Sequence, residues 1–127
     1  MTRTTRILTL TALAGALAFG FLAHAGAAGP APTMTLSVVN IEYEGSKIWV
    51  PSTIVVKKGT KVTLKLINNV PSDPNQHGFA IPDLKIAEIV NRGEPKTVEF
   101  TADKPGVYPI ICQLHPAHVG GELVVLP

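Results

Sequence analysis

The sequence K-V-T-L-K-L-I-N occupies residues 61–68 and shows the clearest periodicity in the chain. Its apolar residues Val62, Leu64 and Leu66 recur at every second position, with polar residues between them. A period of two places these side chains on one face of an extended strand. The stretch therefore predicts a half-buried β-strand, and the turn residues K-G-T at 58–60 predict where it begins.

Similar stretches lie on both sides of this strand, and no part of the mature chain keeps a long helical period. Each is short, rich in β-branched or apolar residues, and bounded by Gly, Pro, Asn or Asp. We expect at most a turn or two of helix, at residues 83–90. The pattern predicts an all-β fold: a two-sheet antiparallel Greek-key β-sandwich of about seven to eight strands. The other expected strands are residues 35–42, 52–57, 78–81, 96–101, 106–112 and 121–125.

The first 25 residues differ in composition from the rest. Arg3 and Arg6 precede an uncharged stretch, residues 7–23, that is rich in Leu, Ala and Gly. The small residues of A-H-A at 23–25 then form a cleavage site. This pattern is typical of a secretory signal peptide at residues 1–25, and it predicts export, to the periplasm in a Gram-negative cell. The alternative is an uncleaved membrane anchor, because about 18 apolar residues can span a bilayer.

Removal of that leader leaves 102 residues, which is enough for one domain. We expect a flexible lead rich in Gly, Ala and Pro at residues 26–33, and a domain at residues 34–127. Arg3 and Arg6 leave with the signal, so nine Lys and Arg balance nine Asp and Glu. A neutral domain lacks the basic surface that nucleic acids or a polybasic membrane contact require. We therefore expect no nucleic-acid partner, and no stable membrane insertion once the signal is cleaved.

Cys112 is the only cysteine of the chain, so it has no partner for an internal disulfide. A buried thiol, an intermolecular link, a nucleophile and a metal ligand are the alternatives. Two histidines, His115 and His118, follow it in C-Q-L-H-P-A-H, within a turn at one end of the sandwich. His77 lies 35 residues upstream, at a loop-to-strand junction that can reach the same end. One thiolate with two or three imidazoles suits copper, then zinc, and is unsuited to Mg or Ca.

Four segments of the chain match the pattern of one known family. They are V-V-K-K-G-T at 55–60, H-G-F at 77–79, T-A-D-K-P-G-V-Y at 101–108, and the C-x-x-H-x-x-H turn at 112–118. On these segments the chain resembles the cupredoxins, the blue-copper family that includes plastocyanin, azurin and amicyanin. The resemblance covers residues 34–127, nearly the whole mature domain.

The resemblance implies a ligand set. In cupredoxins an upstream His, a Cys and a second His shortly after it hold the copper, and these roles fall on His77, Cys112 and His115. Amicyanin-like members place an axial Met three residues after the second His, where this chain has His118. The domain's only methionine, Met34, lies in the first expected strand. We therefore expect one copper per chain, alternating between Cu(I) and Cu(II), with an unusual axial His.

A second likeness concerns the turn itself. Residues 106–116 are similar to nitrosocyanin, a red-copper cupredoxin, in which a carboxylate stands where this chain has His77. An axial imidazole predicts a weaker blue band, a stronger violet band and a lower reduction potential, because nitrogen donation favours Cu(II). Glu122 and a carbonyl near Gln76 are alternative axial ligands if His118 faces solvent.

The expected function is one-electron transfer by an exported mononuclear copper protein that is not an enzyme. The resemblance implies that a redox partner protein docks on an apolar patch near His115 and Pro116. Trp49 and Phe79 are expected as core or site-wall residues rather than electron relays. Asn68 and Asn69 are expected either to hydrogen-bond across the ligand loops or to be simple turn residues.

Other functions remain open at this point. A copper carrier or scavenger needs affinity and exchange rather than reversible redox chemistry. A nitrosocyanin-like open copper site would bind small ligands such as nitric oxide. One Cys with three His also forms a legitimate zinc tetrahedron, and a metal-free adhesive sandwich is a further alternative. A Cys–His hydrolase would need an acidic residue near the ligand loops, where the sequence offers Asp73 and Glu122.

Overall fold

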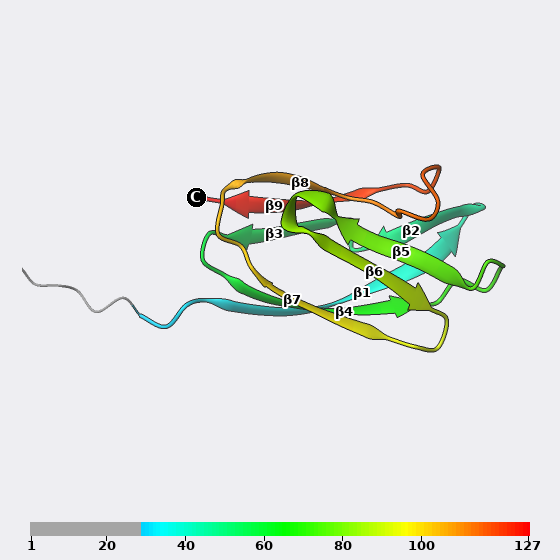
Figure 1. The fold of residues 1–127 in the computed structure, drawn as a ribbon, viewed down its shortest axis with the longest axis horizontal. Helices are drawn as coiled ribbons and strands as arrows, with labels where there is room; N and C mark the ends of the chain where they lie inside the picture. Colours follow the sequence, from blue (N-terminus) through cyan, green and yellow to red (C-terminus); the bar gives the residue numbers. More distant parts are fainter. Residues whose placement is uncertain (1–28) are drawn as a thin grey trace, which may run out of the picture.

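The structure is a computed structural model that describes residues 29–127. The predicted signal peptide, residues 1–25, and the start of the expected lead, residues 26–28, lie outside the described residues. Within 29–127 nine strands and one short helix form a β-sandwich (Figure 1). They are β1 (Thr33–Tyr43), β2 (Ser46–Val50), β3 (Thr53–Lys57), β4 (Lys61–Asn68), β5 (Gln76–Ile81), the 3-10 helix η1 (Pro82–Leu84), β6 (Ile86–Asn91), β7 (Lys96–Thr101), β8 (Gly106–Ile110) and β9 (Gly121–Leu126).

The strands form two sheets and a separate hairpin. One sheet has the order β2-β1-β4-β7, the other has the order β3-β9-β8, and β5 pairs with β6. The hairpin is fastened to the chain just after β8, because the backbones of Ala80 and Ile111 exchange two hydrogen bonds of 2.9 Å. In Figure 1 the turn between β8 and β9 lies at the end of the sandwich opposite the C-terminus. That end also receives the start of β5, so segments distant in sequence meet there.

The predicted β-sandwich is confirmed. β4 covers residues 61–68 and buries Val62, Leu64 and Leu66, as the alternation predicts. β7 also has the expected bounds. The sheets are mixed rather than wholly antiparallel, because β1 runs parallel to β4 and β3 runs parallel to β9.

Two strands were not expected from the sequence. Residues 86–91 form β6 rather than helix, and helical structure in this region is confined to η1. The exposed positions of β6 include the apolar Ile89, which hides the alternation. β2 follows a two-residue hairpin in which Glu44 and Gly45 both have positive φ. Such turns usually carry Asn or Asp at the first position, so the Glu-Gly pair gave little signal.

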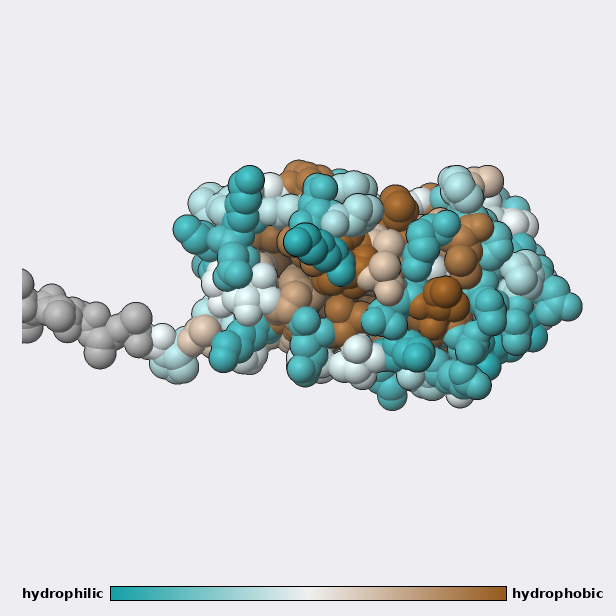
Figure 2. Space-filling view, viewed as in Figure 1, coloured by the Kyte–Doolittle hydropathy of each residue, from teal (hydrophilic) through white to brown (hydrophobic). Residues whose placement is uncertain are grey.

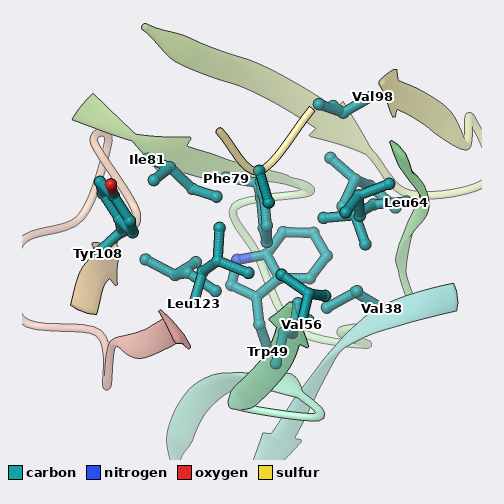
Figure 3. Close-up of a cluster of buried hydrophobic side chains, with 14 of the residues drawn as sticks. Val38, Trp49, Val56, Leu64, Phe79, Ile81, Val98, Tyr108 and Leu123 are labelled. Carbon is teal, nitrogen blue, oxygen red and sulfur yellow. The ribbon is translucent and has the colours of Figure 1, made fainter. Parts of the chain in front are cut away.

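The core lies between the two sheets (Figure 3). Trp49 and Phe79 meet edge to face, with ring centroids 5.3 Å apart. Both are buried, which agrees with their expected place in the core or the site wall. Hydrophobic side chains also reach the surface, in patches between polar residues on the face shown in Figure 2. The helix η1 has three residues, so no helix of residues 29–127 has the length and hydrophobicity needed to cross a membrane.

Candidate metal centre

The structure brings together all four side chains that the sequence singled out. One ligand atom from each of His77, Cys112, His115 and His118 lies within 4.8 Å of the others. The rings of His115 and His118 are stacked, with centroids 4.6 Å apart and 29° between their planes. The His77 ring lies 5.4 Å from His115 and 5.1 Å from His118. The group is therefore compact enough for one ion to be shared by all four residues.

The turn after β8 explains why three of these residues converge. The backbone N–H of His115 donates to the Cys112 carbonyl at 3.1 Å, and that of His118 donates to the His115 carbonyl at 3.0 Å. Two successive turns with a step of three residues thus return each side chain to one side of the loop. This is the physical meaning of the C-x-x-H-x-x-H spacing.

His77 reaches the group from the strand β5. Asn68, the last residue of β4, donates its side-chain N–H groups to the carbonyls of Asn75 at 2.9 Å and Val90 at 3.1 Å. Val90 is the partner of His77 in the β5–β6 register. Asn68 thereby ties β4 to the segment before His77 and to the strand beside it, in agreement with the expected hydrogen bonding across the ligand loops. Its Oδ1 also accepts the Val70 N–H at 3.0 Å, so the expected turn role is present as well.

His77 is a fully buried imidazole without a hydrogen-bond partner. Its exposed fraction is 0%, and neither ring nitrogen has a partner among the described residues. Nδ1 of His118 is also buried and unpartnered within that part of the chain. Leaving a buried polar atom unpaired costs about 1–3 kcal/mol. Orphaned nitrogens beside a thiol fit a metal ion, which would accept a lone pair from each ligand.

The electrostatics of the group favour the neutral form of two of its imidazoles, His77 and His118. Burial, followed by repulsion from charged His118 and His115, lowers the pKa of His77 to about 4. Burial also lowers the pKa of His118, and His115 and Lys47 act in the same direction. A neutral imidazole is the form that binds a metal. Both residues are therefore ready to act as ligands at neutral pH.

The thiol of Cys112 is held by the backbone of β5. Cys112 is 5% exposed, and its Sγ accepts a hydrogen bond of 3.2 Å from the N–H of Gly78. Nδ1 of His115 lies 3.5 Å from the same sulfur. The indole Nε1 of Trp49 donates to the Gly78 carbonyl at 2.9 Å, so both polar groups of this glycine are used. This role of Gly78 was not predicted from the sequence, although a glycine directly after His77, in H-G-F at 77–79, was the available signal.

The other candidate ligands stay outside the group. Met34 lies in β1 opposite Val62 and is absent from the four-residue cluster. The carboxylate of Glu122 lies 3.5 Å from the Thr53 hydroxyl, and Asp73 lies beside Arg92. The cluster contains no carboxylate within the described residues, so no orienting acid supports a Cys–His hydrolase.

A cavity of about 470 Å³ opens beside the ligand turn. Cys112 and His118 form part of its wall, so a small molecule in the cavity would reach one side of the group. The lining residues are Ile111, Cys112, Gln113, Pro116, His118 and Gly120.

Known proteins resemble this chain in sequence and in fold. The nitrous-oxide reductase of Cupriavidus necator is 47% identical over 57 residues, which are 45% of this chain and 9% of that protein. The chain thus spans a small part of the length of this curated relative. The copper nitrite reductase of Nitrosomonas europaea has the same fold, with a TM-score of 0.60 and 22% identity over 75% of this chain and 42% of the other.

The fold also matches another protein over nearly the whole of its chain. Dithionite-reduced auracyanin from Roseiflexus castenholzii superposes with a TM-score of 0.59 and 18% identity, covering 76% of this chain and 99% of that one. Residues 10–125 match the family described as the cupredoxin-like domain. The chain belongs to the cupredoxin-like domain family, and its His/Cys/His/His group is able to bind copper.

Proposed function

We propose that this chain is an exported electron-transfer protein that holds one copper ion through His77, Cys112 and His115, with His118 as the fourth ligand. The observation that carries the proposal is the environment of His77. A fully buried imidazole with two unpartnered nitrogens faces a buried thiol and two further imidazoles. Such a donor set is soft and rich in nitrogen, which favours copper over the hard cations.

The surroundings of the ligands suit reversible electron transfer. Bound copper would supply a one-electron couple between Cu(I) and Cu(II). Asn68 and Trp49 fasten the backbone around His77, and the Gly78 N–H holds the sulfur of Cys112. Ligands held by a rigid framework change little between two oxidation states, so little reorganisation accompanies the transfer.

The stacking of His118 on His115 supports its assignment as the fourth ligand. Its ring centroid lies 5.1 Å from that of the buried His77, and its Nδ1 has no partner within residues 29–127. A fourth nitrogen stabilises Cu(II) more than a weak thioether does, because the imidazole is the stronger donor. The proposed site therefore has a lower reduction potential than one with an axial Met.

The exposed side of the ligand turn is the proposed docking surface for a redox partner protein. His115 is half-buried there, next to the exposed Pro116, and Leu114 and Val119 are 39% and 54% exposed. An uncharged contact of this kind favours a short-lived complex with weak salt dependence. In this proposal the chain carries electrons for other proteins and is not itself an enzyme.

The cavity beside the turn favours one second candidate, an open copper site. Because Cys112 and His118 line it, a small ligand such as azide or nitric oxide would approach the ion from that side. Azide added to the copper-loaded protein separates the two functions. An electron-transfer site keeps its absorption spectrum, whereas an open site gains a new azide-dependent band.

Reversible cycling tests the electron-transfer proposal. We expect copper-loaded protein to be reduced and reoxidised repeatedly with full recovery of its spectrum, in the presence of a Cu(I) chelator. Retention of copper during reduction is the decisive result, because a carrier would release Cu(I) to the chelator. Loss of the metal in the first reduction would favour the copper carrier instead.

A further inference from the structure

The side chain of Gln113 lies directly on the backbone of Gly78. A Cβ atom added to Gly78 would lie 2.6 Å from Cδ of Gln113 and closer still to Oε1. It would also lie 3.0 Å from the backbone nitrogen of Gln113. No real Cβ tolerates such contacts, so the space that any other residue at position 78 would need is filled by Gln113.

The far end of the same side chain is anchored on the neighbouring strand. Nε2 of Gln113 donates a hydrogen bond of 3.0 Å to the carbonyl of Glu88 in β6. Gly78 pairs with Ile89 in the β5–β6 register, next to Glu88. Gln113 therefore crosses from the ligand turn over β5 and ends on β6.

The Gln113 side chain covers Gly78, the residue whose N–H binds the sulfur of Cys112. Gly78 donates its N–H to Sγ of Cys112 at 3.2 Å, and Gln113 directly follows Cys112 in the chain. If the Gln113 side chain were to leave, the turn would lose its hydrogen bond to Glu88 and would keep only that of the Cys112 sulfur as a side-chain hydrogen bond to the β5–β6 hairpin among the described residues. Water would then reach the Gly78 face beneath it.

We propose that Gln113 is a positioning residue: its side chain straps the ligand turn to the β5–β6 hairpin, keeps the Gly78–Cys112 hydrogen bond in place and shields the sulfur from solvent. The cavity beside the turn has Cys112 and Gln113 in its wall. Gly78 is required by this arrangement, since the strap leaves no room for a side chain. The inference concerns the placement of the thiol and adds to the proposed copper site.

Alkylation of Cys112 by iodoacetamide in the folded, metal-free protein tests the strap. We expect Gln113→Ala to react about fivefold faster than the wild type, because one net hydrogen bond changes an opening equilibrium by about that factor. Gln113→Met keeps the covering side chain without the donor, so its rate should fall between the two. Leu114→Ala, in the same turn, is the matched control and should react like the wild type.

Two alkylation results would overturn the proposal. One is an unchanged rate in Gln113→Ala. The other is an equal acceleration in Leu114→Ala, which would mean that any change in the turn loosens it.

A double-mutant cycle tests the link to Gly78. Gly78→Ala should expel the strap and accelerate alkylation by itself. Adding Gln113→Ala to that variant should then change the rate little, because the strap is already displaced. Independent, multiplicative effects of the two substitutions would contradict the proposal. If Gly78→Ala does not fold, the single variants at Gln113 still decide the matter.

The reduction potential and absorption of the copper-loaded protein distinguish a positioning role of Gln113 from a purely structural one. Hydrogen bonding and solvent exclusion at the sulfur tune the reduction potential and the thiolate-to-copper absorption. We expect both to shift in Gln113→Ala, with a fall in potential, and neither to shift in Leu114→Ala. Absence of a thiolate band in the wild type would defeat the proposed function, while the alkylation rates would still decide whether the strap exists.

Discussion

The candidate site joins two regions of different character. His77 belongs to β5, is fully buried, and has Phe79 two residues further along the same strand in the core. Cys112, His115 and His118 belong to a turn whose other residues are mostly exposed. The strand side is thus part of the core, and the turn side is held by a few hydrogen bonds. Changes on the strand side should therefore alter folding, whereas changes in the turn should alter mainly the metal chemistry.

The largest loss of folding stability is expected from a core residue on the strand side. Phe79→Ala removes a fully buried aromatic ring beside Trp49 and should destabilise the metal-free protein by about 3–5 kcal/mol. Leu114→Ala, in the turn, should change stability by less than about 0.5 kcal/mol. Urea unfolding of both variants measures the difference. Similar losses of stability would show that the turn is part of the core.

The next largest loss of stability is expected from acid, which acts on the strand side through His77. The unfolded chain protonates His77 near its ordinary pKa of 6.5, whereas the folded protein resists protonation down to a pKa of about 4. The unfolded state binds more protons in this window, so stability falls as the pH falls through it. The lowered pKa of His77 corresponds to about 3 kcal/mol of folding stability. This contribution is fully present above pH 6.5 and is lost by about pH 4.

Urea unfolding of the metal-free protein at several pH values measures this dependence. His77→Gln cannot titrate and should flatten the curve. His118 should leave a residual slope of the same sign, because its pKa is also lowered. An equally steep curve in His77→Gln would assign the acid sensitivity to other groups.

A smaller effect should come from the backbone around His77. Asn68→Ala removes the side-chain hydrogen bonds to the carbonyls of Asn75 and Val90 and the Oδ1 acceptor of the Val70 N–H, and should cost about 2 kcal/mol. Asn69→Ala is the matched control, because this neighbour is exposed and should matter by less than about 0.5 kcal/mol. Thermal unfolding of both variants would reveal the difference. Equal melting temperatures would mean that the hydrogen bonds of the Asn68 side chain do not stabilise the fold.

On the turn side, a substitution at His118 should change stability the least but should clearly change the copper absorption. His118→Met replaces a strong nitrogen donor by a weak thioether and should move copper absorption from violet toward blue and raise the reduction potential. Unfolding of the metal-free variant should stay close to that of the wild type. An unchanged spectrum would exclude His118 as a copper ligand.

The sequence predicted the regular strands and the four-residue cluster well, for definite reasons. The bounds of β4 and β7 follow from alternation, which only Ile67 interrupts, and the C-x-x-H-x-x-H spacing becomes two successive turns. β2 and β6 were missed because their turn and surface residues depart from the usual patterns. The strap of Gln113 over Gly78 could not be read from the sequence, since it joins a turn residue to a strand 35 residues away.

The central claim is that the buried thiol and imidazoles hold copper together. Its most direct test is addition of one equivalent of Cu(II) to the folded domain, with visible absorption and electron paramagnetic resonance recorded beside Cys112→Ser. We expect an intense thiolate-to-copper band in the wild type that is absent from Cys112→Ser. A wild-type spectrum without that band would contradict the account and leave zinc binding or a structural role as the better explanation of the cluster.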